Sequence, residues 1–277
     1  MLGGWSVTSK NLLNNLNASN KSYASSLEKL STGNRINRAA DDVAGLAISE
    51  KLLSQMNGLN MAAKNTQDGV SLIQTAEGAM NETHAVVQKM RELAVQASND
   101  TNTKQEREAL DLQFQELIKE IDRIAKDTNF NTKTLMNGDN KDKAIKLQIG
   151  ANSGQHMDIF IGNMSWTALL GSNAGDGNLN LLSQGNADTM IGRMDQVLNR
   201  VSTERSQMGA YSNRLEHAYN VTMNTGENLT AAYAQIKDVD YAKEIMNLTR
   251  ESIKQQAITS VMSMHMQSAS NVLNLLR

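Results

Sequence analysis

Apolar residues along much of the chain recur at alternating steps of three and four, the spacing of one face of an α-helix. The first such run ends near Gly33, and glycine is a common C-terminal cap of helices. Its positions are Leu13, Leu16, Asn20, Tyr23, Leu27 and Leu30. Gly3 and Gly4 weaken helix formation in the segment that precedes it. We therefore expect a first helix that ends near residue 32 and carries one apolar seam.

A second and much longer helix is predicted from Asp41-Asp42, whose carboxylates can accept bonds from free helical N–H groups, to about Ser98. Apolar or small residues recur along it at every seventh position: Leu52, Leu59, Thr66, Ile73, Met80, Val87 and Ala94. At 1.5 Å per residue such a helix would be roughly 80 Å long. That length does not suit a small globule.

A third helix should follow the turn at residues 99–102. Thr103 and Glu106 form a capping-box pattern at its start, and its apolar positions continue to residue 128. Because the connection is short, this helix should fold back antiparallel on the second.

The period changes between residues 129 and 185. Ile145, Leu147 and Ile149 alternate with polar residues, as do the positions from Met157 to Ile161. Alternation on both sides of the turn residues 152–154 predicts a β-hairpin. The segment 163–185 is rich in Gly, Asn and Ser, and we expect it to be a loop.

Helical spacing resumes at Met190 and continues to Leu229, and an interruption is expected at Asp238–Asp240. The final helix carries apolar residues on all sides. A helix of that kind needs burial all round. The chain offers no large globular core for it, since aromatic residues make up only 4% of the sequence.

Composition narrows the possible functions. The chain has no proline, which suits long uninterrupted helices, and no cysteine, which excludes disulfides and thiolate chemistry. A net charge of −2 without a basic block gives nucleic acid little attraction. The charge-free run 255–276 is too polar to span a membrane, and the first residues lack the pattern of a secretory signal peptide. The four histidines are isolated, so we expect no metal, no cofactor and no catalytic site.

The terminal segments would expose unusual apolar surface in a monomer. They should pair with each other or with further copies, and heterologous contacts of that kind build rings or helical filaments. A helical bundle that dimerises is the alternative at this point. The residues expected to pack in an assembled core are Leu13, Leu16, Leu27, Leu30, Ile253, Val261, Val272, Leu275 and Leu276.

Longer sequence motifs at both ends resemble those of bacterial flagellins. Residues 31–49 read STGNRINRAADDVAGLAIS, residues 67–78 QDGVSLIQTAEG and residues 91–98 RELAVQAS. In the C-terminal half, NRLEH at 213–217, ENLTAA at 227–232 and NVLNLLR at 271–277 are similar to the same family. The resemblance covers roughly residues 10–135 and 187–277. The start at Leu2 to Val7 departs from the Ile-Asn-x-Asn-like opening of the family, which puts the packing of the first ten residues in doubt.

The resemblance implies a mainly α fold, an elongated bundle of long antiparallel coiled-coil helices with a small β-hairpin region in its centre. The inner layer of a filament would hold residues 1–40 and 236–277, and a second layer residues 41–128 and 186–235. Residues 129–185 would replace the outer domains of longer flagellins. The family's function would be non-enzymatic: a filament subunit for swimming motility.

The same resemblance implies partners and a location. The subunit would be exported unfolded through the flagellar type III apparatus, without a cleavable signal peptide, into the extracellular filament. An export chaperone would cover the C-terminal helix, and cap and hook-associated proteins would meet the polymer. No role with nucleic acid or membranes is implied.

A polar cluster lies at the break between the first two helices: Arg35, Asn37, Arg38, Asp41 and Asp42. Helix capping accounts for part of it. The resemblance adds a joint between the filament layers that fixes the register of neighbours.

A second surface resembles the one that an animal Toll-like receptor recognises in many flagellins. It includes Lys89 and Leu93, and Gln113 stands where recognised flagellins often carry a glutamate, which would weaken recognition. The alternative interpretation is a purely structural role, in which these residues only pack subunits together.

Two other functions compete with the filament subunit. A hook–filament junction protein has similar terminal sequences, although the sequence motifs at 91–98 and at the C-terminus favour flagellin. A flagellin-like enzyme would carry a hydrolase in its centre, but this centre is short and has no metal motif.

Overall fold

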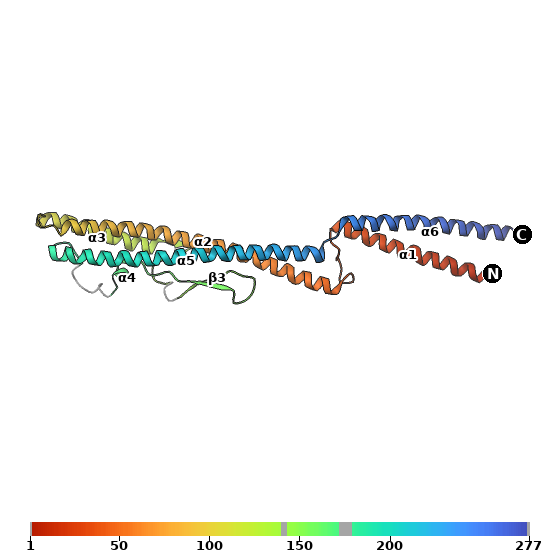
Figure 1. The fold of residues 1–277 in the computed structure, drawn as a ribbon, viewed down its shortest axis with the longest axis horizontal. Helices are drawn as coiled ribbons and strands as arrows, with labels where there is room; N and C mark the ends of the chain where they lie inside the picture. The colour runs from red at the N-terminus through yellow and green to blue at the C-terminus, as the bar shows by residue number, and fades with distance from the viewer. Residues whose placement is uncertain (1, 140–142, 172–178, 276–277) are drawn as a thin grey trace. The chain divides into compact units, whose positions relative to one another are not determined.

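The computed structural model describes residues 2–139, 143–171 and 179–275. It forms two compact units, one of Met1–Gln55 with Glu227–Arg277 and one of Met56–Gly226. The elements in chain order are α1 (Leu2–Thr32), α2 (Val43–Ala97), α3 (Lys104–Asp127), β1 (Asn129–Phe130), β2 (Lys133–Thr134), β3 (Ile145–Gln148), β4 (His156–Ile159), α4 (Trp166–Leu170), α5 (Gln184–Lys237) and α6 (Tyr241–Leu275). The prediction of a mainly α fold with long antiparallel helices and a central β-hairpin is confirmed (Figure 1).

The first unit is built on α1 and α6, which lie side by side with the two chain ends at the same end of the pair (Figure 1). Helix α1 ends where Gly33 takes a φ of +73° and donates its N–H to the Lys29 carbonyl at 2.9 Å. The predicted break between α5 and α6 is present, and Asp240 accepts the N–H of Lys243 at 3.1 Å to open α6. A short antiparallel bridge joins Asn34 to Asp238.

The start of α1 departs from the expectation drawn from its glycines. Gly3 and Gly4 were expected to weaken helix there, yet α1 begins at Leu2. Two glycines cost on the order of 2 kcal/mol in a helix interior. In a helix of 31 residues, tertiary contacts farther along can offset a cost of that size.

The second unit is a helical bundle in which α2 and α5 run antiparallel. Arg91 of α2 and Asp195 of α5 form an ion pair at 2.6 Å. Helix α3 folds back on α2 as predicted, because Arg107 donates to the Ala97 carbonyl at 3.1 Å, and the Thr103–Glu106 capping box opens α3. The fully buried core of this unit includes Ile73, Met80, Val87, Met90, Phe114, Ile121, Met190, Met194, Val201, Met208 and Leu215. Among these, Ile73, Met80 and Val87 are positions of the seven-residue spacing predicted for the second helix.

The predicted β-hairpin is β3–β4, in which Ile145 pairs with Ile159 and Leu147 with Met157. Gly154 makes its turn with a φ of +84°. The hairpin approaches α2 so closely that a Cβ on Gly69 would lie 2.6 Å from Leu147 Cδ1. Glycine at position 69 therefore permits the contact.

Two small elements were not predicted. The β1–β2 hairpin turns through Asn131 and Thr132 at positive φ, and α4 occupies part of the segment expected to be a loop. Asp122 of α3 accepts the Trp166 N–H at 2.9 Å and so caps the start of α4. Arg200 of α5 donates to the Leu169 carbonyl at 2.8 Å at its other end. Partners distant in sequence fix this five-residue helix, and local spacing could not predict it.

Candidate assembly surface and interhelical joint

Residues 33–42, which we call the joint, connect α1 to α2 and contact the end of α5. The Arg35 N–H donates to the Lys237 carbonyl at 2.7 Å, and Arg35 Nε and Nη2 donate to the Ile236 carbonyl at 3.2 and 2.7 Å. The last four carbonyls of a helix lack partners within it, and a cation is favourable at that end. Arg35 therefore caps the C-terminus of α5.

Two aspartates organise the other side of the joint. Asp41 Oδ2 accepts the backbone N–H groups of Asn37 and Arg38 at 3.0 and 2.9 Å. These bonds hold the pKa of Asp41 below its ordinary value. Asp42 Oδ1 accepts the Gly45 N–H at 2.8 Å and caps the start of α2.

Arg38 forms an ion pair with Glu28 of α1 at 3.0 Å, and its side chain is 72% exposed. Asn37 Nδ2 donates to the Asn34 carbonyl at 3.2 Å. The structure therefore gathers all the predicted joint residues in one hydrogen-bonded turn. Their role in polymerisation stays a prediction.

The sequence reasoning missed the apolar centre of this turn. Ile36 is only 1% exposed, and a Cβ on Gly45 would lie 2.7 Å from its Cδ1 and would collide with Asp42. Glycine at position 45 therefore lets α2 begin against Ile36. The available signal was a single large apolar residue within a polar stretch.

The face of α1 that meets α6 differs from the predicted seam. The buried or half-buried positions on α1 include Leu12, Leu16, Ser19, Tyr23 and Ser26. Leu13 and Leu27 are 49% and 44% exposed, whereas Leu16 and Leu30 are half-buried. The contact between the terminal helices thus combines buried serines with half-buried apolar side chains, and two of the predicted leucines point away from it.

Helix α6 also presents apolar side chains away from α1. Ile253 and Val261, two of the expected packing residues, are 61% and 44% exposed. The other exposed ones are Tyr241, Ile245, Met246, Met264 and Met266. The side chains of Val272, Leu275 and Leu276 lie outside the described residues. We call the outward apolar residues of α1 and α6 the outer ridges, and soluble monomers rarely expose so many along one pair of helices.

The candidate receptor surface has two exposed members and one buried member. Lys89 is exposed and pairs with Glu92 at 2.8 Å, and Gln113 is exposed on α3. Leu93, however, is 4% exposed and belongs to the hydrophobic core of the second unit. The burial of Leu93 supports the packing interpretation of this residue, and its role in receptor recognition stays a prediction.

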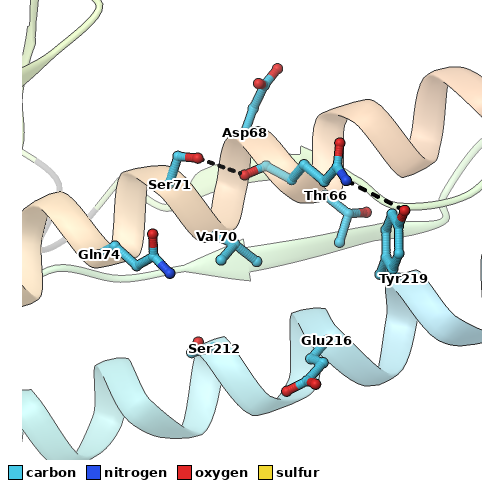
Figure 2. Close-up of a pocket in the computed structure, with 9 residues that line it drawn as sticks. Thr66, Asp68, Val70, Ser71, Gln74, Ser212, Glu216 and Tyr219 are labelled. Atoms are coloured by element: carbon cyan, nitrogen blue, oxygen red, sulfur yellow. Dashed lines mark hydrogen bonds between the residues drawn. The ribbon is translucent and has the colours of Figure 1, made fainter.

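A polar groove of about 710 Å³ lies between α2 and α5 in the second unit (Figure 2). Gln67 donates to the Tyr219 hydroxyl at 3.3 Å across it, and Ser71 donates to the Gln67 carbonyl at 3.0 Å. Asp68 and Glu216 supply its two carboxylates. This lining offers hydrogen bonds but no nucleophile with an adjacent base.

Within the described ranges, no group of three or more His, Asp or Glu residues is placed to hold a metal ion. No helix among these residues is both long enough and apolar enough to cross a membrane.

The fold and its exposed ridges define a class: a helical subunit whose two terminal helices pair in an antiparallel manner and present apolar surface outward. The chain belongs to the bacterial flagellin family. Residues 6–141 match the model of the bacterial flagellin N-terminal helical region, and residues 191–276 match that of the C-terminal helical region.

Two flagellins of known organisms match this chain over nearly the whole length of both sequences. The chain is 46% identical to a flagellin of Halalkalibacterium halodurans, with 97% of this chain and 95% of that one covered. It is 43% identical to a flagellin of Bacillus subtilis, with 98% of both covered.

Solved structures give the same fold. A Bacillus cereus flagellin is 32% identical, with a TM-score of 0.50 over 61% of this chain and 94% of that one. A putative flagellar hook-associated protein of Vibrio parahaemolyticus is 14% identical, with a TM-score of 0.60 over 72% of this chain and 100% of that one, and shows likeness of fold alone.

Proposed function

We propose that this protein is the structural, non-enzymatic subunit of a bacterial flagellar filament and polymerises through its terminal helices. The observation that carries the proposal is the pair of outer ridges on α1 and α6. The flagellins of Halalkalibacterium halodurans and Bacillus subtilis, which match over 95% and 98% of their own length, support it.

The driving force for polymerisation is burial of the ridges. Ile253, Val261 and the other outward residues are about half exposed in the subunit. Complete burial of one such side chain contributes roughly 1.5–3 kcal/mol relative to full exposure. Several half-exposed residues on each helix suffice to offset the cost of ordering a subunit in a polymer. Because the two helices present different side chains, successive contacts are heterologous and can continue without closing.

Further partners follow from the same surface. An unpolymerised subunit exposes the apolar ridge of α6, and an export chaperone that covers this helix would prevent premature association. Cap and hook-associated proteins would meet the two ends of the polymer through the same ridges. We place the working protein in the filament outside the cell, after type III export.

A host Toll-like receptor would reach Lys89 and Gln113, which are exposed, and not Leu93. The joint would lie between the inner layer, formed by residues 1–40 and 236–277, and the second layer. Its hydrogen bonds to the last turn of α5 would hold the α1–α2 connection against the end of α5.

The test is polymerisation of the purified full chain, followed by negative-stain microscopy. We expect long uniform filaments after addition of salt or seeds, and none from a chain that lacks residues 236–277. Ile253→Gln should slow or prevent growth, whereas the matched control Ile253→Leu, which keeps the apolar area, should not. A discrete small oligomer from the full chain would instead support a hook–filament junction protein.

A further inference from the structure

We propose that two serine–glutamate pairs in the seam between α1 and α6 fix the register of the terminal helices, and so determine which residues the outer ridges present to neighbours. The pairs are Ser19 with Glu251 and Ser26 with Glu244.

Both serines are buried against α6. Ser19 is 5% exposed and Ser26 is 6% exposed. Ser19 Oγ donates to Glu251 Oε2 at 3.0 Å, and Ser26 hydrogen-bonds the Glu244 side chain. Seven residues separate the two serines and seven separate the two glutamates. The two pairs therefore belong to one antiparallel register with the heptad spacing of a coiled coil.

The carboxylates in this seam are held in their charged form. Glu251 is 13% exposed in its side chain and also pairs with Lys254 at 2.8 Å. The hydrogen bonds from Lys254 and Ser19 lower the pKa of Glu251. Partial burial raises the pKa of Glu244, but hydrogen bonds from Ser26 and Asn247 outweigh it and leave the pKa lowered. Charged groups in such a seam need these donors, because a buried charge without a partner is costly.

A slip of one heptad, roughly 10 Å along the axis, shows why two pairs are needed. In one direction Ser19 would meet Glu244, but Glu251 would face the apolar Leu12. In the other direction Ser26 would meet Glu251, but Ser19 would face Ile258. Either slip keeps one pair and breaks the other, so only the observed register satisfies both.

The apolar residues of α6 cannot specify the register by themselves, because they surround the helix. Polar groups in a helical seam are known to select one register at some cost in stability. The consequence for assembly rests on the proposed function: a slipped pair would display Leu13 and Ile253 about two turns away from their present relation.

The chain has no cysteine, so introduced cysteines can report the register by disulfide formation. Leu12→Cys with Ile258→Cys lies in the observed register, and Leu12→Cys with His265→Cys reports a one-heptad slip. Both double variants are polymerised, oxidised and dissolved, and only cross-links within one chain are counted on a non-reducing gel.

The test variant replaces both pairs with apolar contacts through Ser19→Ala, Ser26→Ala, Glu244→Leu and Glu251→Leu. A second variant exchanges the partners through Ser19→Glu, Ser26→Glu, Glu244→Ser and Glu251→Ser. With native seams, the register-matched cross-link should exceed the slipped one by about tenfold or more, which corresponds to about 1.4 kcal/mol. The apolar variant should reduce that ratio to below about threefold, and the exchanged variant should restore it.

An unchanged ratio in the apolar variant would overturn the proposal while leaving the filament function intact. If the apolar variant does not polymerise, the double variant Ser19→Ala with Ser26→Ala should still lower the ratio of register-matched to slipped cross-links. An unchanged ratio in this double variant would overturn the proposal in the same way. If the unsubstituted full chain forms no filament, the proposed function fails, and the same cross-link ratio measured on the unpolymerised chain decides the register.

Discussion

Replacement of Arg35 should weaken polymerisation more than it weakens the folded core. Arg35 joins the α1–α2 connection to the last residues of α5, through two side-chain bonds to the Ile236 carbonyl and one backbone bond to Lys237. Arg35→Ala removes the two side-chain bonds and leaves the backbone bond in place. None of these partners belongs to the unit Met56–Gly226, which holds most of the hydrophobic core.

The size of the effect follows from the geometry. A hydrogen bond from a charged donor contributes about 1.5–3 kcal/mol when it is protected from water. Arg35 is exposed, so solvent screening reduces the expected loss to about 1 kcal/mol. If the filament holds the joint in this conformation, the critical concentration rises by about fivefold, since each 1.4 kcal/mol is a factor of ten. Arg35→Glu adds repulsion from the helix C-terminus of up to about 1 kcal/mol. This variant should therefore raise the critical concentration by roughly thirtyfold relative to the parent.

The assay measures the soluble protein left at equilibrium with seeded filaments, alongside thermal unfolding of each variant followed by circular dichroism. Arg38→Ala is the matched control, because Arg38 lies in the same joint but forms only an exposed ion pair with Glu28. Exposed pairs contribute about 0–1 kcal/mol, and the 72% exposure of Arg38 places this one below about 0.5 kcal/mol. The critical concentration should therefore change by less than about threefold. An Arg35→Ala protein that polymerises like the parent would refute the capping role of Arg35. If Arg35→Ala and Arg38→Ala raise the critical concentration equally, Arg35 acts only through its charge and not as a helix cap.

Three further outcomes are expected. Asp42→Lys removes the cap at the start of α2, costs about 1–2 kcal/mol, and should shorten filaments with less effect on unfolding of the subunit; filaments of normal length would contradict this. Leu93→Ala leaves a cavity in the core, costs about 2–5 kcal/mol, and should lower the unfolding temperature by roughly 10 °C. In a Toll-like receptor reporter assay, the response to this variant should fall only as far as its stability does. Lys89→Ala should instead change the receptor response without changing the unfolding temperature. The lowered pKa of Asp41 stabilises the joint above its ordinary pKa of about 3.9, and that stability is lost as pH falls through the folded-state pKa. The difference in stability between the parent and Asp41→Asn should therefore be constant near neutral pH and should shrink below about pH 4.

The long elements were predictable because their apolar spacing is regular over many turns. Ile73, Met80 and Val87 mark one face of α2, and all are fully buried. The Thr103–Glu106 capping box and Gly33 mark helix ends through local bonds that the sequence already specifies. The small elements were not predictable, since Asp122 and Arg200 stabilise α4 from other helices.

The surface was predicted less well than the fold, for a physical reason. A heptad pattern shows which residues share a face but not which neighbour that face meets. Leu13 and Leu27 share a face, yet the face that meets α6 contains Ser19 and Ser26. The same limit applies to Leu93, because a family resemblance identifies a surface without reporting the burial of each side chain.

The contact between Ser19 and Glu251 joins residues 232 positions apart in the chain. The unit Met56–Gly226 is continuous in sequence, so it can fold as soon as its own residues are available. The unit that contains α1 and α6 is discontinuous, and its two halves can meet only after everything between them has been made. Closing a loop of that length carries an entropic cost that falls when the intervening segment is already compact. Folding should therefore proceed from the middle outward, with the ends meeting last. A chain cut short by incomplete synthesis or by proteolysis would lack the second half of this unit, and the order of folding would thus exclude incomplete molecules from the growing polymer.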